Sequence, residues 1–237
     1  MDIKNKNVLI TGGALRIGKA LCIAFAEAGA NVTIHCNKSE TAAENLLSEL
    51  GGGGKHRIVR CDLACPEEVA ALFDSAGPID ILVNNASMFQ PEPLPVESAE
   101  QFRRHFEVNF FAPVTLMKKF HGQLNGKPGC IINFLDQDVA KVSSRSGSYS
   151  LSRKALRDAT LSAALQMAPQ VRVNAIAPGP VMPPPGMEGS KMEQILKEVP
   201  LLRPVDLRDL TLACIFLAAN ESITGEILFV DCGQHLK

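Results

Sequence analysis

An apolar run, a glycine-containing turn and a helical pattern open the chain in that order, and this order most constrains the fold. The run covers residues 8–11, the turn covers 12–18, and the helical pattern continues to Gly29. A buried strand that leads through such a turn into a helix directs free backbone N–H groups and the positive end of the helix dipole at one point. Glycine lets a bound group approach the backbone closely. The segment therefore predicts a dinucleotide-binding unit, with a glycine-rich loop that binds no ligand as the alternative.

The second predicted strand ends without an acidic residue. A carboxylate usually stands at this point when the ribose of the dinucleotide carries a free 2′-hydroxyl. Residues 35–39 read His-Cys-Asn-Lys-Ser and contain no carboxylate. Lys38 and Arg16 can instead bind a 2′-phosphate, so the sequence favours NADP(H) over NAD(H).

Length and composition limit the architecture and the partners. A chain of 237 residues, 46% of them hydrophobic, can bury a large core and fits one α/β domain over 1–237. A formal net charge of −1 leaves no basic stripe for nucleic acid. The apolar runs are short, and the first residues lead straight into a strand. We therefore expect no signal peptide, no membrane association and a cytoplasmic location.

Seven strand-like apolar runs alternate with helical patterns along the chain. This alternation predicts a parallel, doubly wound sheet with crossover helices, as in a Rossmann fold. The runs cover approximately residues 8–11, 31–36, 57–61, 79–84, 129–134, 171–176 and 226–231. The proline-rich segment 178–199 follows the sixth run, where ligands of open α/β sheets bind. We expect a mobile loop that covers the substrate there, with a connector of no function as the alternative.

The seven cysteines are scattered, and several lie in apolar patterns where a thiol packs as a small hydrophobic group. We expect them to be reduced. Cys61 and Cys65 are the only close pair, and neither a second pair nor histidines at ligand spacing accompany them. No metal site is predicted.

The only tyrosine of the chain, Tyr149, stands at the start of a helical pattern, and Arg153 shares its helix face four residues later. A phenol beside a fixed cation can donate a proton near a hydride acceptor, and the cation is expected to lower its pKa. Polar residues end two predicted strands, Asp62 the third and Asn-Asn-Ala-Ser at 84–87 the fourth. They can contact the cofactor or only cap the strand ends.

Together these features resemble the short-chain dehydrogenase/reductase family over essentially the whole chain. The matching motifs are Thr11-Gly12 with Gly18, Asn84-Asn85-Ala86, Asn109, Tyr149 with a basic residue four positions on, Pro178-Gly179 and Asp231-Cys232-Gly233. The resemblance implies an oxidoreductase with a small-molecule substrate. It also implies a homotetramer built from the helices near 97–124 and 147–168 and from the last strand.

Asp136 resembles one branch of that family, the pteridine reductases. Most family members carry serine thirteen positions before the tyrosine, where this chain has Asp136. Arg16, the segment 35–39 and Phe89 also resemble that branch, in which the aromatic ring stacks the pterin against the nicotinamide. The resemblance implies NADPH-dependent reduction of a 7,8-dihydropterin, such as dihydromonapterin or dihydrobiopterin, to the tetrahydropterin. Hydride would go to carbon, and a proton would reach the neighbouring ring nitrogen through Tyr149 and Asp136.

The charge of Asp136 agrees with a pterin substrate. An ionised carboxylate would repel the negative charge that develops on a carbonyl oxygen, whereas the guanidine-like edge of a pterin attracts it. A carbonyl or 3-oxoacyl-thioester reductase remains an alternative, because fold alone does not fix the substrate. The simpler interpretations are that Asp136 caps a turn, that Phe89 is a core residue and that Tyr149 is a surface residue.

Arg153 departs from the family pattern, which has lysine at this position. Arginine also carries a fixed positive charge and can bind the nicotinamide ribose, but its guanidinium is wider and differently directed. A catalytically silent NADP(H)-binding protein is therefore a third hypothesis.

The predicted site residues fall into three groups. The catalytic residues are Asp136, Tyr149 and Arg153. The substrate-binding residues are Phe89, Asp136, Tyr149 and Val181. The cofactor-binding residues are Gly12, Arg16, Ile17, Gly18, His35, Asn37, Lys38, Ser39, Asp62, Leu63, Asn85, Ala86, Ser87, Asn109, Tyr149, Arg153, Pro178 and Gly179.

Overall fold

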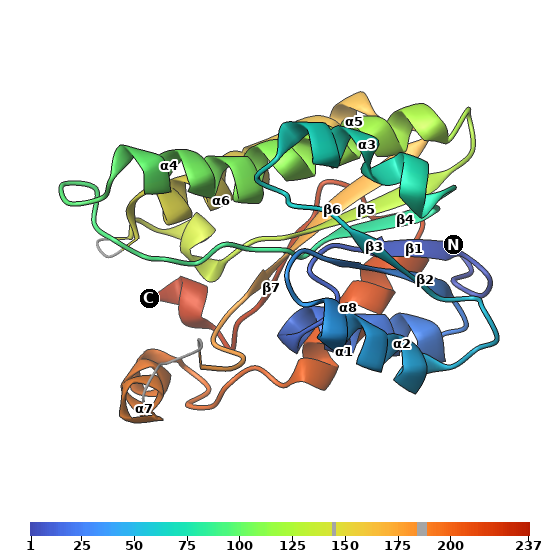
Figure 1. Cartoon of the computed structure of the whole chain (residues 1–237). Helices are drawn as coiled ribbons and strands as arrows, with labels where there is room; N and C mark the ends of the chain where they lie inside the picture. The colour runs from blue at the N-terminus through green and yellow to red at the C-terminus, as the bar shows by residue number, and fades with distance from the viewer. Residues whose placement is uncertain (144–145, 184–188) are drawn as a thin grey trace.

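Seven parallel strands form one sheet in the computed structural model, which describes residues 1–143, 146–183 and 189–237 (Figure 1). Their order across the sheet is β3-β2-β1-β4-β5-β6-β7. The strands are β1 (Asn7–Ile10), β2 (Asn31–Cys36), β3 (Arg57–Arg60), β4 (Ile81–Asn84), β5 (Gly129–Phe134), β6 (Val171–Pro178) and β7 (Ile227–Val230). The predicted seven-stranded, doubly wound Rossmann-like fold is confirmed.

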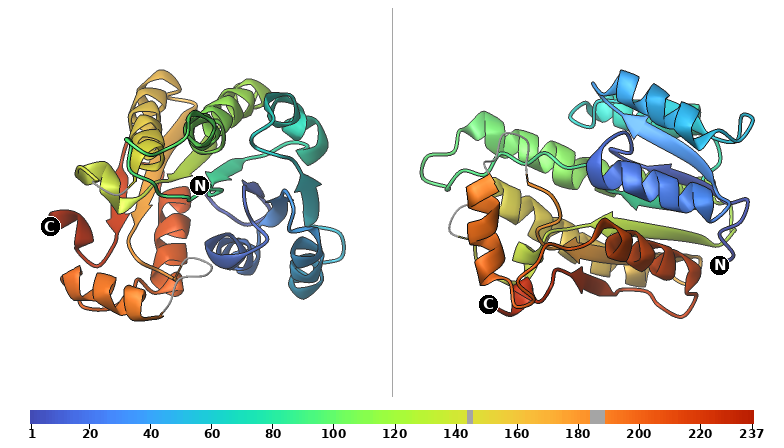
Figure 2. Two further views of the ribbon diagram at one scale, coloured as in Figure 1. Left: turned by 60° about the vertical axis from the view of Figure 1, so that its left-hand side comes forward. Right: turned by 90° about the horizontal axis from the view of Figure 1, so that it is seen from below.

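Helices cover both faces of the sheet (Figure 1). One face carries α1 (Arg16–Glu27), α2 (Glu40–Leu50) and α8 (Leu207–Ala219). The other carries α3 (Pro66–Ala76), α4 (Ala99–Phe106), α5 (Ala112–Gln123) and α6 (Gly147–Gln166). A π-helical turn, η1 (Glu107–Phe111), joins α4 to α5, and short 3-10 helices lie at η2 (Gln137–Ala140) and η3 (Gln234–Leu236). Figure 2 shows the same layers from two further directions.

The core consists of two apolar clusters, one on each side of the sheet. Successive residues of β1 point to opposite faces, so that Val8 and Ile10 join the cluster beneath α1 and α8, and Leu9 joins the other. Each fully buried leucine or isoleucine contributes about 1.5–3 kcal/mol to folding. Burial on both faces explains why the strands appear in the sequence as apolar runs without alternation.

The strand order places the candidate site. β1 pairs with β2 on one side and with β4 on the other, so the connections leave β1 and β4 in opposite directions. Ligands of such sheets bind outside the carboxyl ends of the strands at this switch point. The segments after β1, β4, β5 and β6 therefore surround one site.

The segment predicted as a loop over 178–199 is partly helical. Residues 189–198 form α7 (Gly189–Glu198), which lies outside the two helical layers near the C-terminus (Figure 1). The loop prediction is wrong for this part, because residues 190–198 contain neither proline nor glycine and include several strong helix formers. Residues 184–188, also within the predicted loop, lie outside the described residues.

All seven cysteines lie in the described segments, and none of them is in a disulfide there. Burial raises the pKa of the Cys61 thiol to about 12 and that of the Cys130 thiol to about 11. Such thiols are protonated and unreactive near neutral pH. No helix in the described part of the chain is long and apolar enough to cross a membrane.

Candidate active site

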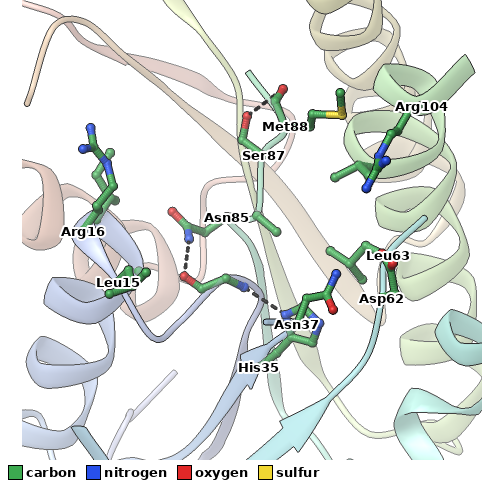
Figure 3. Close-up of a pocket in the computed structure, with 15 residues that line it drawn as sticks. Leu15, Arg16, His35, Asn37, Asp62, Leu63, Asn85, Ser87, Met88 and Arg104 are labelled. Atoms are coloured by element: carbon green, nitrogen blue, oxygen red, sulfur yellow. Dashed lines mark hydrogen bonds between the residues drawn. The ribbon is translucent and has the colours of Figure 1, made fainter. Parts of the chain in front are cut away.

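The turn after β1 borders a cavity of about 490 Å³ (Figure 3). Gly12 has a φ of +63°, and a Cβ on it would lie 3.1 Å from the Cα of Ala86. A Cβ on Gly18 would lie only 2.0 Å from the carbonyl oxygen of Gly12. Both positions therefore require glycine, and the backbone of the turn faces the cavity without a side chain in between.

Helix α1 begins at this turn without a side-chain cap. Leu15 occupies the N-cap position. The structure describes the whole first turn of the helix, and this turn contains no acidic side chain. The N–H groups at this end and the positive end of the helix dipole are thus available to an anion. The turn and the helix start together fit the pyrophosphate of a dinucleotide.

His35 of β2 supports the glycine turn from inside the sheet. Its Nδ1 accepts a hydrogen bond from the backbone N–H of Gly12 at 3.0 Å, and its Nε2 lies 3.1 Å from the carbonyl oxygen of Cys61. Because a carbonyl only accepts, the proton is on Nε2. Burial lowers the pKa of His35 to about 4, so the ring is neutral near pH 7. His35 thus lines the cavity without offering a positive charge to a phosphate.

The ends of β1 and β4 are joined by Thr11 and Asn85. The Thr11 hydroxyl oxygen accepts from the backbone N–H groups of Asn85 and Ala86, both at 3.0 Å. The Asn85 amide in turn donates to the carbonyl oxygen of Thr11 at 2.9 Å. These bonds fix the chain that follows β4 along the rim of the cavity.

Most of the predicted cofactor-binding residues line this cavity. They are Gly12, Arg16, Ile17, Gly18, His35, Asn37, Asp62, Leu63, Asn85, Ala86 and Ser87. Lys38 and Ser39 do not line it: Lys38 is exposed after the end of β2, and Ser39 precedes α2. Asn109 is buried, bonds both backbone groups of Met88 and lies outside the cavity.

Four further residues that the sequence did not predict line this cavity: Leu15, Met88, Arg104 and Val108. Arg104 of α4 is the most informative of them, because it brings a positive charge to the wall that faces Asp62 and Leu63 (Figure 3). The sequence offers only a pair of arginines in the last turn of a helix as a signal. Nothing in a local pattern relates that helix to a turn some ninety residues earlier.

Arg16 lies between this cavity and a second one. Its guanidinium donates to the carbonyl oxygens of Pro183 and Met182 at 3.0 and 3.1 Å. Figure 3 shows the side chain on the far side of the cavity from Asn37, the residue before Lys38. Lys38 follows Asn37 in the chain, so Arg16 and Lys38, both predicted to bind one 2′-phosphate, start from different sides of the cavity.

The second cavity has a volume of about 680 Å³ and adjoins the first. The two share Arg16, Ile17, Asn85 and Ser87. The predicted residues that line the second cavity are Phe89, Asp136, Tyr149, Arg153, Pro178, Gly179 and Val181. Met192 and Ile195 of α7 also line it and lie in the segment 178–199 that was predicted to cover the substrate. Four lining residues were not predicted, namely Phe134, Leu135, Gln137 of η2 and Gln234 of η3. The places of Gln137 and Gln234 depend on how these short elements pack, which periodicity does not encode.

Asp136 and Tyr149 are directly hydrogen-bonded. The Tyr149 hydroxyl donates to Oδ2 of Asp136 at 2.8 Å, while Oδ1 accepts from the backbone N–H of Asp138 at 2.9 Å. The carboxylate thus caps η2 and contacts the phenol, so the capping interpretation and the functional one are compatible. Burial raises the pKa of Asp136.

The pKa of Tyr149 is raised well above its ordinary value, first by burial and then by the carboxylate of Asp136. Arg153 acts in the opposite direction but is outweighed. The cation therefore lowers this pKa as expected, but the expectation of a lowered pKa overall is wrong. Sequence spacing identified the cation, but not the burial that dominates it.

Arg153 is buried in α6 with its guanidinium carbon 5.6 Å from the centre of the Tyr149 ring. Its Nη1 donates to the carbonyl oxygen of Phe134 at 3.1 Å, whereas Nε is buried and has no partner among the described residues. An unpaired buried donor costs about 1–3 kcal/mol. Arg153 also lines the second cavity, where its guanidinium can donate to a ligand that supplies an acceptor, such as a ribose hydroxyl.

Phe89 is 44% exposed, so the interpretation as a core residue is wrong. Its ring meets the ring of Tyr149 edge to face, with centroids 4.7 Å apart. Phe89, Tyr149 and Asp136 thus border one space that opens toward the dinucleotide cavity.

Known proteins share this architecture. A family model described as enoyl-(acyl carrier protein) reductase matches residues 13–235. A short-chain type dehydrogenase/reductase of Picea abies is 30% identical, over 95% of this chain and 91% of that protein. A glucose 1-dehydrogenase of Gluconobacter oxydans is 31% identical, over 98% of this chain and 92% of that protein.

Solved structures give the same result. The crystal structure of FolM alternative dihydrofolate reductase 1 from Brucella canis, complexed with NADP, has a TM-score of 0.91 to this chain and is 37% identical. The match covers 100% of this chain and 97% of that chain. The protein therefore belongs to the short-chain dehydrogenase/reductase family of oxidoreductases.

Proposed function

We propose that this chain reduces 7,8-dihydropterins to tetrahydropterins with NADPH. The observation that carries the proposal is the hydrogen bond between Asp136 and Tyr149 at the wall of the second cavity. A carboxylate at this position suits a substrate with donor groups, such as the amino-pyrimidine edge of a pterin. The exposed ring of Phe89 offers a flat surface for stacking a bicyclic substrate.

NADP(H) is the cofactor of this reaction. Residues 35–39 contain no carboxylate to repel a 2′-phosphate, and Lys38 lies next to the lining residue Asn37. Arg104 adds a second cation on the opposite wall. The FolM structure of Brucella canis was solved as a complex with NADP, which supports the same choice.

The cofactor, when bound, supplies the hydride. Tyr149 has a raised pKa and therefore stays protonated near neutral pH, so it acts as a proton donor and not as a base. Its hydroxyl delivers a proton to the ring nitrogen next to the carbon that is reduced. Asp136, bonded to that hydroxyl, holds it in place and can pass on a replacement proton. Arg153 balances the negative charge of Asp136 and lines the cavity in which the nicotinamide ribose is proposed to bind.

A carbonyl or acyl-thioester reductase is the second candidate, because the matching family model carries an enoyl-(acyl carrier protein) reductase description. Such an enzyme must stabilise negative charge on the substrate oxygen. Asp136 opposes that charge, whereas a pterin ring nitrogen that gains a proton does not develop it.

The active chain is proposed to be a homotetramer. Several large apolar side chains are exposed on α4, η1 and α6: Phe102, Phe111, Leu161 and Leu165. Phe102 and Phe111 belong to one group of phenylalanines in ring contact, and apolar side chains that gather at the surface are typical of subunit interfaces.

Oxidation of NADPH in the presence of a 7,8-dihydropterin, compared with a 3-oxoacyl thioester, tests the proposal. Asp136→Ser should lower kcat for the pterin by about 10²–10⁴-fold, the contribution of a positioned acid or base. Asp138→Asn is the matched control, because this neighbouring carboxylate does not contact Tyr149 in the described structure.

Turnover of the thioester alone would contradict the proposal in favour of the second candidate. NADPH binding without turnover of either substrate, and with turnover restored by Arg153→Lys, would instead indicate a chain that binds its cofactor and no longer catalyses.

A further inference from the structure

A buried cluster of Glu97, His105 and Ser148 lies beside the substrate cavity and has no part in the proposed chemistry. The side chains of His105 and Glu97 are 0% and 1% exposed, and Ser148 is 0% exposed. Buried groups of this polarity are costly unless each finds a partner. Their hydrogen bonds define what the cluster holds together.

The hydrogen bonds assign the protons in the cluster. The backbone N–H of Gln90 donates to Nε2 of His105 at 3.3 Å, so that nitrogen carries a lone pair and the proton is on Nδ1. Nδ1 lies 2.6 Å from Oγ of Ser148 and 3.2 Å from Oε1 of Glu97. Glu97 accepts from both the hydroxyl and the backbone N–H of Ser148. The cluster is satisfied with Glu97 ionised and His105 neutral.

This cluster connects the two segments that carry the rings of the site. Gln90 directly follows Phe89, and Ser148 directly precedes Tyr149. The ring of His105 itself lies 6.0 Å from that of Tyr149, between centroids. The side chain of Gln101 in α4 donates to the carbonyl oxygen of Gln90 at 2.7 Å, so α4 holds the backbone at Gln90 from both sides of the residue.

We propose that neutral His105 is a positioning residue, which holds Phe89 against Tyr149 through the N–H of Gln90 and so sets the stacking surface for the substrate. This role rests on the proposed pterin reduction. Protonation of Nε2 would bring two N–H donors face to face and remove the bond to Gln90. The position of Phe89 would then depend on pH.

Several charged or titratable groups face His105 and determine when this happens. Burial lowers the pKa of His105, and Arg153 on α6 also lowers it, whereas Glu97, which precedes α4, raises it without overcoming the burial. Tyr149 stays neutral because its own pKa is raised. His105 is therefore neutral at and above neutral pH, and it becomes protonated only in acid.

Two substitutions of His105 test the hydrogen bonds of its two ring nitrogens independently. In His105→Gln, the side-chain carbonyl can reach the Nε2 position and still accept from Gln90. In His105→Asn, the shorter amide can still donate at the Nδ1 position but does not reach Gln90. Loss of one neutral hydrogen bond corresponds to about a 2- to 10-fold change. We expect His105→Asn to raise KM for the dihydropterin by about that factor, with kcat and KM for NADPH little changed, and His105→Gln to resemble the wild type.

The pH dependence of KM for the dihydropterin distinguishes a positioning role of His105 from a merely structural one. KM of the wild type for the dihydropterin should rise in acid, below the ordinary range in which histidines gain a proton, and this rise should be absent in His105→Gln. Equal KM values in both variants, or an equal rise of KM for NADPH and for the pterin, would overturn the proposal. Thermal unfolding of each variant identifies any general loss of fold.

Tyrosine fluorescence keeps this test independent of turnover. The chain has one tyrosine and no tryptophan, so its emission reports on Tyr149 alone. Both variants remove the ring beside Tyr149, but only His105→Asn also releases Gln90, so the emission should change more in His105→Asn than in His105→Gln. If it does so while the wild type reduces no pterin, the proposed function has failed and the positioning role stands. If the wild type reduces pterins and the two variants do not differ from each other in emission or KM, the positioning role has failed and the function stands.

Discussion

Two charged residues act on the phenol of Tyr149 in opposite directions. Burial raises its pKa most, Asp136 raises it further, and Arg153 lowers it. A tyrosine that must serve as a base in alcohol oxidation needs a lowered pKa, whereas a proton donor in a reduction does not. At the scale of single residues, the carboxylate therefore favours reduction.

Removing that carboxylate charge should lower the pKa of Tyr149. In Asp136→Asn, the amide neither repels the phenolate nor holds the hydroxyl as strongly, so the tyrosinate forms at lower pH. An absorbance titration measures this directly, because Tyr149 is the only tyrosine. Asp138→Asn serves as the control, and an unchanged titration in Asp136→Asn would contradict the electrostatic account of this pair.

The buried ring of His35 should make folding depend on pH. Its pKa of about 4 lies below the value of about 6.5 in an unfolded chain, so the unfolded state binds more protons between these limits. The contribution to stability is complete above about pH 6.5 and is lost as pH falls toward about 4, by up to ~3 kcal/mol. Urea unfolding at several pH values measures it. His35→Asn should flatten the acid side of the curve and His121→Asn should not; equal slopes in all three proteins would be inconsistent with this role.

At the scale of secondary-structure elements, the sequence predicted what is local. Apolar runs identified all seven strands, and the four-residue spacing of Tyr149 and Arg153 correctly placed them on one face of α6. It did not predict α7, because the prolines before it dominated the pattern. It also missed Arg104, which lines the first cavity with residues distant in the sequence, and His105, which meets Ser148 through the packing of α4 against α6. Such pairings depend on tertiary contacts that no short window of sequence contains.

The start of α1 is the element most sensitive to a single methyl group. Gly18→Ala places a Cβ against the Gly12 carbonyl, and overpacking of this kind typically costs about 1–3 kcal/mol. The turn must open, so the affinity for NADPH, measured by NADPH fluorescence, should fall. The midpoint of urea unfolding should fall as well. Gly122→Ala in α5 is the matched control: a Cβ there meets nothing within 4 Å, and stability should rise by about 0.5 kcal/mol. Equal behaviour of the two variants would refute this explanation of the turn.

At the scale of the whole molecule, a group of phenylalanines is partly exposed on a single chain. Phe102, Phe106, Phe110 and Phe111 form an aromatic cluster along α4 and η1, with neighbouring ring centroids 5.2 to 6.4 Å apart. Phe111 is 49% exposed, and the exposed leucines of α6 lie on the helix that packs against α4. This surface is the one proposed to bind a second copy of the chain.

A charge in that surface should reduce the size of the assembly. Phe111→Glu would bury a carboxylate without a partner in the proposed interface, which is strongly unfavourable. Light scattering coupled to gel filtration should give the mass of a tetramer for the wild type and a smaller mass for the variant. Ala71→Glu adds the same side chain at an exposed position of α3 and should leave the mass unchanged. A wild-type mass of one chain would contradict the proposed assembly.

The most direct measurement of the central claim follows hydride from cofactor to substrate. NADPH deuterated at the nicotinamide C4 is mixed with the wild-type protein and a 7,8-dihydropterin, and the product is analysed by mass spectrometry. We expect a tetrahydropterin that carries deuterium on a ring carbon. In Tyr149→Phe this product should no longer form. A product without deuterium, or no tetrahydropterin at all while a thioester is reduced, would contradict it.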